Sequence, residues 1–245
     1  MQAPFASEII SVKLFSISEN AEKNIAEKAR VSSPNPKSGK LGLISYLIRN
    51  SHWSPFEMEH MTLTIECPRD IGRQILRHWS FNFQEFSQRY ANVDQLQPEL
   101  FLREVRRQDL KNRQNSIPDL DPKVSKEAYK MQGKVWETCR EVYRHMIKMG
   151  VAKECARVVL PEGLTMSRLH MDGNIRSWLH YCDLRSGHGT QSLHAQIALK
   201  ARDIIQDKLP HIYNAFFVKR WTLDKIKADM KDNFPEAYEK YFGKK

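Results

Sequence analysis

The stretch "MTLTIECPRDIGRQILRHW", residues 61–79, predicts a strand that runs directly into a helix. Residues 61–67 contain β-branched side chains and have the pattern of a strand. Pro68 ends that strand, and proline suits the first turn of a following helix. We expect the helix over about 69–79, with Ile71, Ile75 and Leu76 available to anchor it to a core. This region therefore predicts a fold that combines α and β structure.

The predicted helix also carries a row of arginines. Arg69, Arg73 and Arg77 recur at positions i, i+4 and i+8, which places them on one face. Such a row is usually a solvated face. Here the chain continues into "SFNFQEFSQRY" (80–90), which has several aromatic residues and no clear helical or strand period. We interpret this segment as an ordered loop that holds a site, for either RNA or an anionic ligand with a flat ring.

The rest of the chain alternates similar elements without a repeat or a linker, which predicts a single domain over 1–245. A polar, exposed excursion is expected over 106–124, and a helical, charged tail after Pro210. Strands are expected at 8–18 and 163–171. Helices are expected at 19–32, 41–50, 125–150 (closed by Gly150), 152–161, 173–186 and 192–209.

Composition limits the class of protein. The 245 residues carry a formal net charge of +10, which favours polyanions or phosphorylated small molecules as ligands. The four cysteines, Cys67, Cys139, Cys155 and Cys182, are widely spaced and are expected to be reduced thiols. Neither a signal peptide nor an apolar run long enough to span a bilayer is evident. We therefore expect a soluble, cytoplasmic protein.

Several catalytic signatures are absent from the sequence. It contains no P-loop, no GxGxxG after a strand, no GxSxG elbow and no HExxH helix. The densest His/Glu cluster is "HWSPFEMEH" (52–60). A metal site is possible there, but a packed or hydrogen-bonded structural role is favoured, and we expect no metal.

Arginines in ordered contexts remain as the chemical signal: Arg73, Arg77, Arg89, Arg157, Arg176 and Arg185. Guanidinium groups bind phosphate in fork geometry and hydrogen-bond planar carbonyl edges. An RNP1-like run, a GXXG clamp and an RGG tract, which are typical of RNA-binding modules, are absent. The pattern therefore favours a compact phosphorylated ligand.

The segment "RHWSFNFQEFSQRY" (77–90) resembles the signature of flavin-dependent thymidylate synthases, Arg-His-Arg, seven residues, then Ser. It keeps Arg77, His78 and Ser87 and departs at Trp79, where that family usually has arginine. Other segments are similar to family motifs in the same order along 29–204: "ARVSS" (29–33), "HWSPFEMEH" (52–60), "PRDIGRQILRH" (68–78), "ARVVLPEGLTM" (156–166), "GNIRSWLHYCDLR" (173–185) and "HAQIALKARDI" (194–204).

The resemblance implies a homotetramer of α+β subunits, each with a mixed or antiparallel sheet flanked by helices, and active sites built from more than one chain. It implies reductive methylation of dUMP to dTMP. Methylenetetrahydrofolate would donate the carbon, and FAD reduced by NADPH would carry the hydride. Two alternatives stay open: FAD-dependent modification of a related pyrimidine nucleotide, and a non-catalytic, basic nucleic-acid-binding protein.

The resemblance also implies roles for individual residues. Arg185 is the expected catalytic residue, because a guanidinium beside the uracil N3 and carbonyl edge would stabilise negative charge there. Ser87 is expected to contact substrate rather than act as a nucleophile, and Cys67 is expected to be a buried strand residue. The expected FAD-binding residues are Ser54, Glu57, Arg77, His78, Trp79, Glu85, Asn174, Arg176 and His180. The expected dUMP-binding residues are Gln74, Arg77, Glu85, Ser87, Gln88, Arg89, Arg157 and Arg185.

Overall fold

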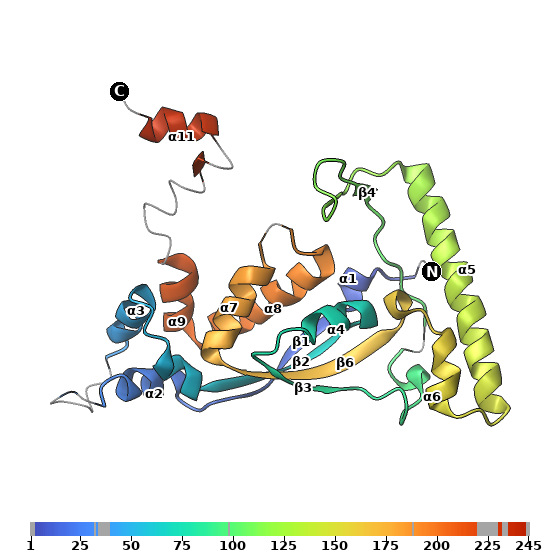
Figure 1. The fold of residues 1–245 in the computed structure, drawn as a ribbon, viewed down its shortest axis with the longest axis horizontal. Helices are drawn as coiled ribbons and strands as arrows, with labels where there is room; N and C mark the ends of the chain where they lie inside the picture. Colours follow the sequence, from blue (N-terminus) through green and yellow to red (C-terminus); the bar gives the residue numbers. More distant parts are fainter. Residues whose placement is uncertain are drawn as a thin grey trace. The chain divides into compact units, whose positions relative to one another are not determined.

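The computed structural model describes residues 3–31, 33, 40–97, 99–187, 189–219, 230–231 and 235–243 (Figure 1). The chain folds into two compact units. The first unit contains residues 1–17 and 60–201, and the second contains 18–59 and 202–245. Among the described helices, none is long and apolar enough to cross a bilayer. The single domain expected over 1–245 remains a prediction.

The first unit is built on a four-stranded antiparallel sheet with strand order β1-β2-β6-β3 (Figure 1). Its strands are β1 (Ser11–Ile17), β2 (His60–Pro68), β6 (Met166–Asn174) and β3 (Asn82–Glu85). The central pair is in register from His60 opposite Asn174 to Pro68 opposite Met166. The α+β prediction with an antiparallel sheet is therefore confirmed.

One face of the sheet is buried. Met61, Leu63 and Ile65 alternate along β2 with half-buried threonines, and all three are fully buried. Two helices, α4 (Arg69–Ile75) and α7 (Ile175–Arg185), pack against β2 and β6. The buried Trp178 of α7 donates its indole N–H to the carbonyl of Met61 at 2.7 Å. This contact fixes α7, and the predicted arginine at its end, against the sheet.

The opposite face of the central pair is polar. Thr62 donates to Asp172 at 2.8 Å, and Thr64 lies 3.0 Å from the ring of His170. Arg168 pairs with a third β2 side chain, Glu66, and its Nε lies 2.6 Å from the carboxylate. Each of these pairs is directly opposite in the strand register. The alternation thus assigns one face to the core and the other to hydrogen bonds.

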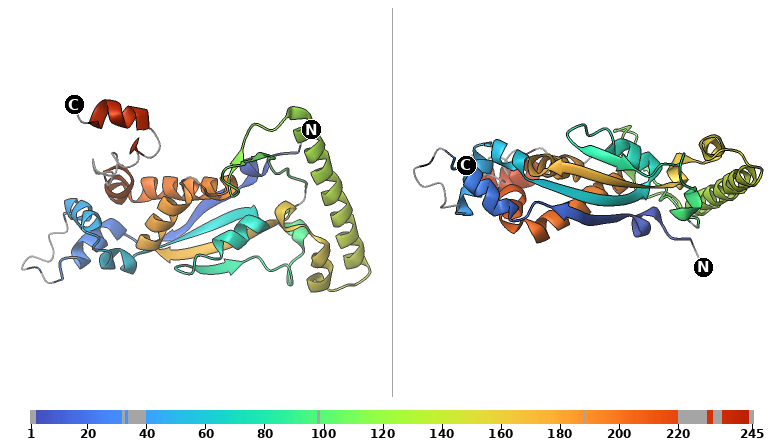
Figure 2. Two further views of the ribbon diagram at one scale, coloured as in Figure 1. Left: turned by 45° about the horizontal axis from the view of Figure 1, so that its top comes forward. Right: turned by 90° about the horizontal axis from the view of Figure 1, so that it is seen from below.

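The long helix α5 (Pro122–Lys148) contacts α6 (Lys153–Ala156) and η3 (Arg157–Val159), as the further views show (Figure 2). Asp121 caps its start by accepting from Lys123 N and Val124 N, and Gly150 follows its end with a positive φ of 83°. The unit also contains α1 (Ala6–Ile9), η2 (Val93–Gln95), the short hairpin β4 (Arg107–Gln108) and β5 (Ser116–Ile117), and η4 (Glu162–Leu164).

The second unit is helical where it is described. It contains α2 (Ala21–Lys28), α3 (Gly42–Arg49), η1 (Ser54–Met58), α9 (Pro210–Tyr213), η5 (Asn214–Val218) and α11 (Pro235–Phe242). The helix α8 (Ser192–Lys208) begins in the first unit and ends in this one. Buried Glu59 accepts hydrogen bonds from Lys28 and Asn24, which is a structural role for that part of the His/Glu cluster.

Most predicted elements are confirmed with boundaries shifted by a few residues. Two predictions around the opening stretch are wrong. The segment 80–90 is not only a loop, because residues 82–85 form the edge strand β3 and pair with β6. The helix expected over 69–79 ends at Ile75, so Arg77 lies in the following turn rather than in a helical row. The predictions for residues 32, 34–39 and 220–229 lie outside the described residues.

Candidate active site

The turn after α4 presents the signature residues Arg77, His78 and Trp79. The N–H of His78 donates to the Ile75 carbonyl at 3.0 Å, and the N–H of Phe81 donates to the His78 carbonyl at 3.1 Å. These bonds close the turn and lead the chain into β3. The side chain of Trp79 is 96% exposed. The turn therefore offers a cation and a full indole ring to a ligand or to another chain.

Behind this turn lies a polar group that we call the Arg185 cluster. Its members are Arg185, His78, Tyr181, His194, Gln74 and Gln191. Arg185 donates its Nε–H to Nε2 of His78 at 2.9 Å. The His78 ring meets Tyr181 edge-on, with ring centroids 5.0 Å apart. α7 thus supplies the arginine, and the turn supplies the acceptor that orients it.

The two histidines of the Arg185 cluster are held neutral. Burial, followed by the positive charge of Arg185, lowers the pKa of His78 to about 4, and Arg77 adds to the effect. Burial and Arg185 also lower the pKa of His194 to about 4. A neutral His78 can accept from Arg185 through Nε2, whereas an imidazolium could not. The cluster therefore concentrates its positive charge on Arg185.

The side-chain amide of Gln74 is held from both ends. Its Nε2 donates to Oε1 of Gln191 at 2.6 Å, and its Oε1 lies 3.4 Å from Nδ1 of His194. Nε2 of His194 in turn lies 3.2 Å from the hydroxyl of Tyr181. Both His194 and Tyr181 are buried. This chain of contacts fixes the orientation of Gln74, a predicted substrate residue.

A second feature, which we call the arginine pocket, is a cavity of about 250 Å³. Arg69 and Arg73 reach it from α4, and Arg157 reaches it from η3. Glu162 also lines it and lies 3.6 Å from Arg69 Nε and 3.5 Å from Arg73 Nε. Glu85 pairs with the same two arginines, at 3.3 Å from Arg69 Nη1 and 3.8 Å from Arg73 Nη1. Three guanidinium groups against these two carboxylates leave a positive balance, as a site for a phosphate requires.

Gln88 completes the arginine pocket with a hydrogen-bond donor. Its side chain is 5% exposed, and its Nε2 is buried without a hydrogen-bond acceptor among the described residues. A buried amide without an acceptor is costly, about 1–3 kcal/mol. An anion in the pocket would satisfy this donor and the surrounding cations together.

The beginning of α7 carries three predicted cofactor residues. Asn174 caps the helix by accepting from the N–H of Ser177 at 2.8 Å. Arg176 and His180 lie half-buried one helical turn apart on the same face. Arg176 on α7 and Arg77 in the turn supply cations, and Trp79 supplies an aromatic surface, which are the residue types that a flavin and its diphosphate require. The turn itself contacts the other end of α7, at Arg185.

The remaining predicted residues are divided among other places. Ser87 lines a separate groove of about 490 Å³ together with Glu85, and Arg89 forms an exposed ion pair with Glu154 at 2.8 Å. Ser54 and Glu57 lie on η1 in the second unit. The structure of one chain thus brings Gln74, His78 and Arg185 together and, separately, Gln88 and Arg157. The ligand-binding roles of all these residues remain predictions.

Sequence reasoning missed Arg69, Tyr181 and Gln191 as residues of these two features. Arg69 belongs to the basic row in the sequence, but the row gave no reason to expect Arg69 in a ligand site rather than on a solvated helix face. Tyr181 and Gln191 carried no signal, because their contacts join α7, the turn after it and α4. Cys67 is fully buried, and burial raises the pKa of its thiol to about 12, which confirms the prediction of a buried strand residue.

Comparison with known proteins decides the family. Residues 13–211 match the family model described as thymidylate synthase complementing protein. The chain belongs to this family. The flavin-dependent thymidylate synthase of Synechocystis sp. is 46% identical over 189 residues, which are 77% of this chain and 86% of that protein. A probable flavin-dependent thymidylate synthase of Paramecium bursaria Chlorella virus 1 is 41% identical, over 84% of this chain and 98% of that protein.

Solved structures of the UMP/dUMP methylase PolB from Streptomyces cacaoi have the same fold. The form bound with 5-Br dUMP has a TM-score of 0.75 and 24% identity, over 89% of this chain and 97% of that chain. The form bound with 5-Br UMP has a TM-score of 0.74 and 26% identity, over 85% of this chain and 94% of that chain. The family model and the two curated relatives confirm the family predicted from the ordered motifs.

Proposed function

We propose that this chain is a flavin-dependent thymidylate synthase that methylates dUMP reductively to dTMP. Family membership supports the reaction class, and the names of the relatives support FAD as cofactor. The structural observation that supports dUMP as the substrate is the arginine pocket. Its three guanidinium groups and the unsatisfied amide of Gln88 would bind the phosphate group of the nucleotide. NADPH as reductant and methylenetetrahydrofolate as carbon donor complete the proposal.

Arg185 has the catalytic role in this proposal. Its Nε–H is engaged by His78, so the edge formed by its two terminal nitrogens is available to meet the uracil N3 and carbonyl edge. Positive charge at that edge stabilises negative charge on the uracil N3 and carbonyl edge, which makes C5 a better nucleophile toward the one-carbon unit. Because His78 is neutral at pH 7, it orients the guanidinium by accepting a hydrogen bond and adds no second positive charge beside it.

The other residues bind and position ligands. Gln88, Arg157, Arg69 and Arg73 hold the phosphate, and Gln74 contacts the nucleotide from the Arg185 cluster. The turn residues Arg77 and Trp79, with Arg176 on α7, hold the flavin. FAD supplies hydride transfer when it is bound. The protein is a homotetramer of single-domain chains, and its active sites are built from more than one chain. The predicted residues that lie outside the two features complete these sites: Ser54, Glu57, Ser87 and Arg89.

The test measures flavin, substrate and product separately. The purified protein is incubated with FAD and desalted, and its visible spectrum is recorded before and after addition of NADPH and of dUMP. Formation of dTMP from dUMP and methylenetetrahydrofolate is the expected product. UMP is assayed in parallel, because PolB is named for both nucleotides and would make UMP the second candidate substrate. Flavin binding without methylation of dUMP would contradict the proposal.

The role of Arg185 has its own prediction. Arg185→Ala should lower kcat by about 10²- to 10³-fold, the cost of removing one preorganised charge contact from a transition state. FAD retention should change little, because Arg185 is expected at the uracil. Arg107→Ala is the matched control, since Arg107 forms an ion pair with Asp119 in the exposed hairpin. Equal loss of turnover and of flavin binding in Arg185→Ala would argue against the role.

A further inference from the structure

Two elements that line the arginine pocket are joined by a side chain from outside it, Arg103. This residue lies in the segment between η2 and β4, and its side chain is 16% exposed. Its Nη1 donates to Asp70 Oδ1 of α4 at 2.7 Å and to the carbonyl of Gly163 in η4 at 2.9 Å. Asp70 follows the pocket residue Arg69 in the sequence, and Gly163 follows the pocket residue Glu162. Arg103 therefore ties α4 to η4 next to the residues that line the pocket.

The backbone that carries Arg103 is itself held in place. Leu102 is buried, its N–H donates to the Pro4 carbonyl at 2.8 Å, and its carbonyl accepts from the Ala6 N–H at 2.7 Å. The side-chain amide of Gln132 in α5 accepts from the N–H of Arg103 at 2.7 Å and donates to its carbonyl at 2.9 Å. The guanidinium of Arg103 therefore extends from a fixed position.

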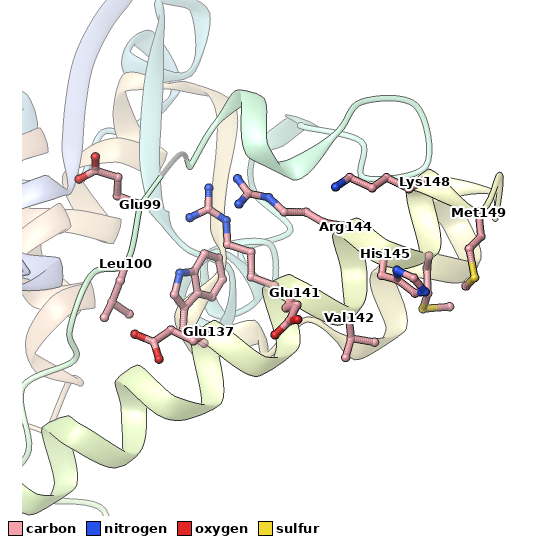
Figure 3. A pocket seen from close by; sticks show the side chains of 12 residues that line it. Glu99, Leu100, Glu137, Glu141, Val142, Arg144, His145, Lys148 and Met149 are labelled. Atoms are coloured by element: carbon pink, nitrogen blue, oxygen red, sulfur yellow. The ribbon is translucent and has the colours of Figure 1, made fainter.

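The hydrogen bonds of Gln132 matter because a groove separates the neighbouring part of the segment from α5. The groove has a volume of about 1070 Å³ and is lined by Glu99 and Leu100 of the segment and by α5 residues from 136 onward. Figure 3 shows Glu99 and Leu100 beside α5, with Glu137 on the helix itself. Gln132, one helical turn before this groove, thus fixes Arg103 to α5.

Arg103 also affects the charge that the arginine pocket presents. Asp70 lies in the first turn of α4, three residues before Arg73, and side chains at this spacing are neighbours on a helix. The carboxylate of Asp70 pairs with Arg103 at 2.7 Å. Without Arg103 it would be free to pair with Arg73, as a third carboxylate against the three guanidinium groups of the pocket. The positive balance that a phosphate requires would then be lost.

We propose that Arg103 is a positioning residue, which acts through Asp70 and Gly163 to hold the arginine pocket in the geometry and charge balance that bind a phosphate group. This inference rests on the proposed function, because it takes the phosphate of dUMP as the ligand of the pocket. Loss of Arg103 should displace α4 and η4 slightly rather than unfold them. The N–H of Arg69 still donates to the Thr165 carbonyl at 2.8 Å and keeps the start of α4 attached.

The test compares a ligand that has the phosphate with one that lacks it. Dissociation constants for dUMP and for deoxyuridine are measured by calorimetry on the FAD-loaded wild type and on Arg103→Ala. We expect the variant to bind dUMP about tenfold more weakly, the cost of one charge-assisted hydrogen bond, and to bind deoxyuridine as the wild type does. KM for dUMP should rise in the same proportion, with little change in kcat.

Two further variants complete the comparison. Arg106→Ala is the matched control, because Arg106 lies in the same segment and contacts Glu104 and Ser116, at 3.4 and 3.0 Å. It should bind both ligands like the wild type. Arg103→Lys keeps a positive charge beside Asp70 and should recover part of the affinity for dUMP.

The outcomes separate this inference from the proposed function. If Arg103→Ala binds dUMP as tightly as the wild type, or loses affinity for dUMP and deoxyuridine equally, Arg103 does not act through the phosphate and the inference is overturned. Retention of FAD and the circular dichroism spectrum show whether the variant is folded. A wild type that binds dUMP no more tightly than deoxyuridine would overturn the phosphate site of the proposed function and this inference with it.

Discussion

At the scale of residues, the hydrogen bonds of the Arg185 cluster require its two histidines to be neutral. His78 accepts from Arg185, so it must be neutral, and burial keeps it neutral at pH 7. His194 lies between Gln74 and Tyr181 and is neutral for the same reason. The sequence motifs identify His78 and Arg185. They do not show that one residue positions the other.

Gln191 should position Gln74 for substrate. Removing its amide in Gln191→Ala leaves the Nε2 of Gln74 without the 2.6 Å acceptor, so the amide can rotate away from its productive orientation. We expect KM for dUMP to rise by about tenfold with a smaller change in kcat. Gln191→Glu retains an acceptor and should restore most of the affinity. Thr190→Ala, a neighbouring change without this contact, is the control, and an equal effect there would contradict the role.

At the scale of elements, the sequence predicted which segments are helices and strands better than it predicted how the signature segment folds. The alternation in residues 61–67 was sufficient for β2, because a buried strand needs little else. Residues 82–85 show no such alternation, and they form a strand because β6 offers hydrogen bonds at its edge. In the same way, the helix period could not show that α4 ends at Ile75, since the turn that follows is closed by backbone hydrogen bonds and leads to Phe81, whose ring packs against Gly173 of β6.

That packing makes Gly173 a sensitive position. A Cβ at Gly173 would lie 2.3 Å from the Phe81 ring, whereas one at Gly72 in α4 would meet its nearest neighbour at 3.5 Å. Gly173→Ala should therefore lower the free energy of unfolding by about 1–3 kcal/mol. Gly72→Ala should be neutral or stabilising by up to about 1 kcal/mol. Urea denaturation of both variants measures this, and equal destabilisation would show that the Phe81 contact is not the cause.

At the scale of the whole molecule, the chemistry is divided between features that a single α4 helix connects. Arg69 and Arg73 extend to the arginine pocket, and Gln74, the next residue, extends to the Arg185 cluster. The family motifs predicted residues of both features, because the motifs are local in sequence. Ser87 and Gln88, both expected to bind dUMP, line different cavities. The motifs could not show this, because adjacent side chains on an irregular segment can point to opposite sides.

Stability of the whole chain should depend on pH through the two buried histidines. In the unfolded chain a histidine binds a proton below about pH 6.5, whereas His78 and His194 have a pKa of about 4 in the fold. The unfolded state therefore binds more protons between pH 6.5 and 4. The free energy of unfolding should fall as the pH falls through this window, by up to about 1.4 kcal/mol per pH unit for each histidine.

His194, which is 1% exposed, should account for more of this slope than the half-buried His78, because water screens an exposed charge. His194→Gln should be less stable than the wild type at pH 7 but should lose less stability between pH 6.5 and 5. Carboxylates that titrate in acid affect both proteins equally and cancel in the comparison. Urea denaturation at several pH values measures the two slopes, with exposed His52→Gln as the control. If His194→Gln and the wild type have the same slope, then His194 is not the buried neutral group that holds Gln74.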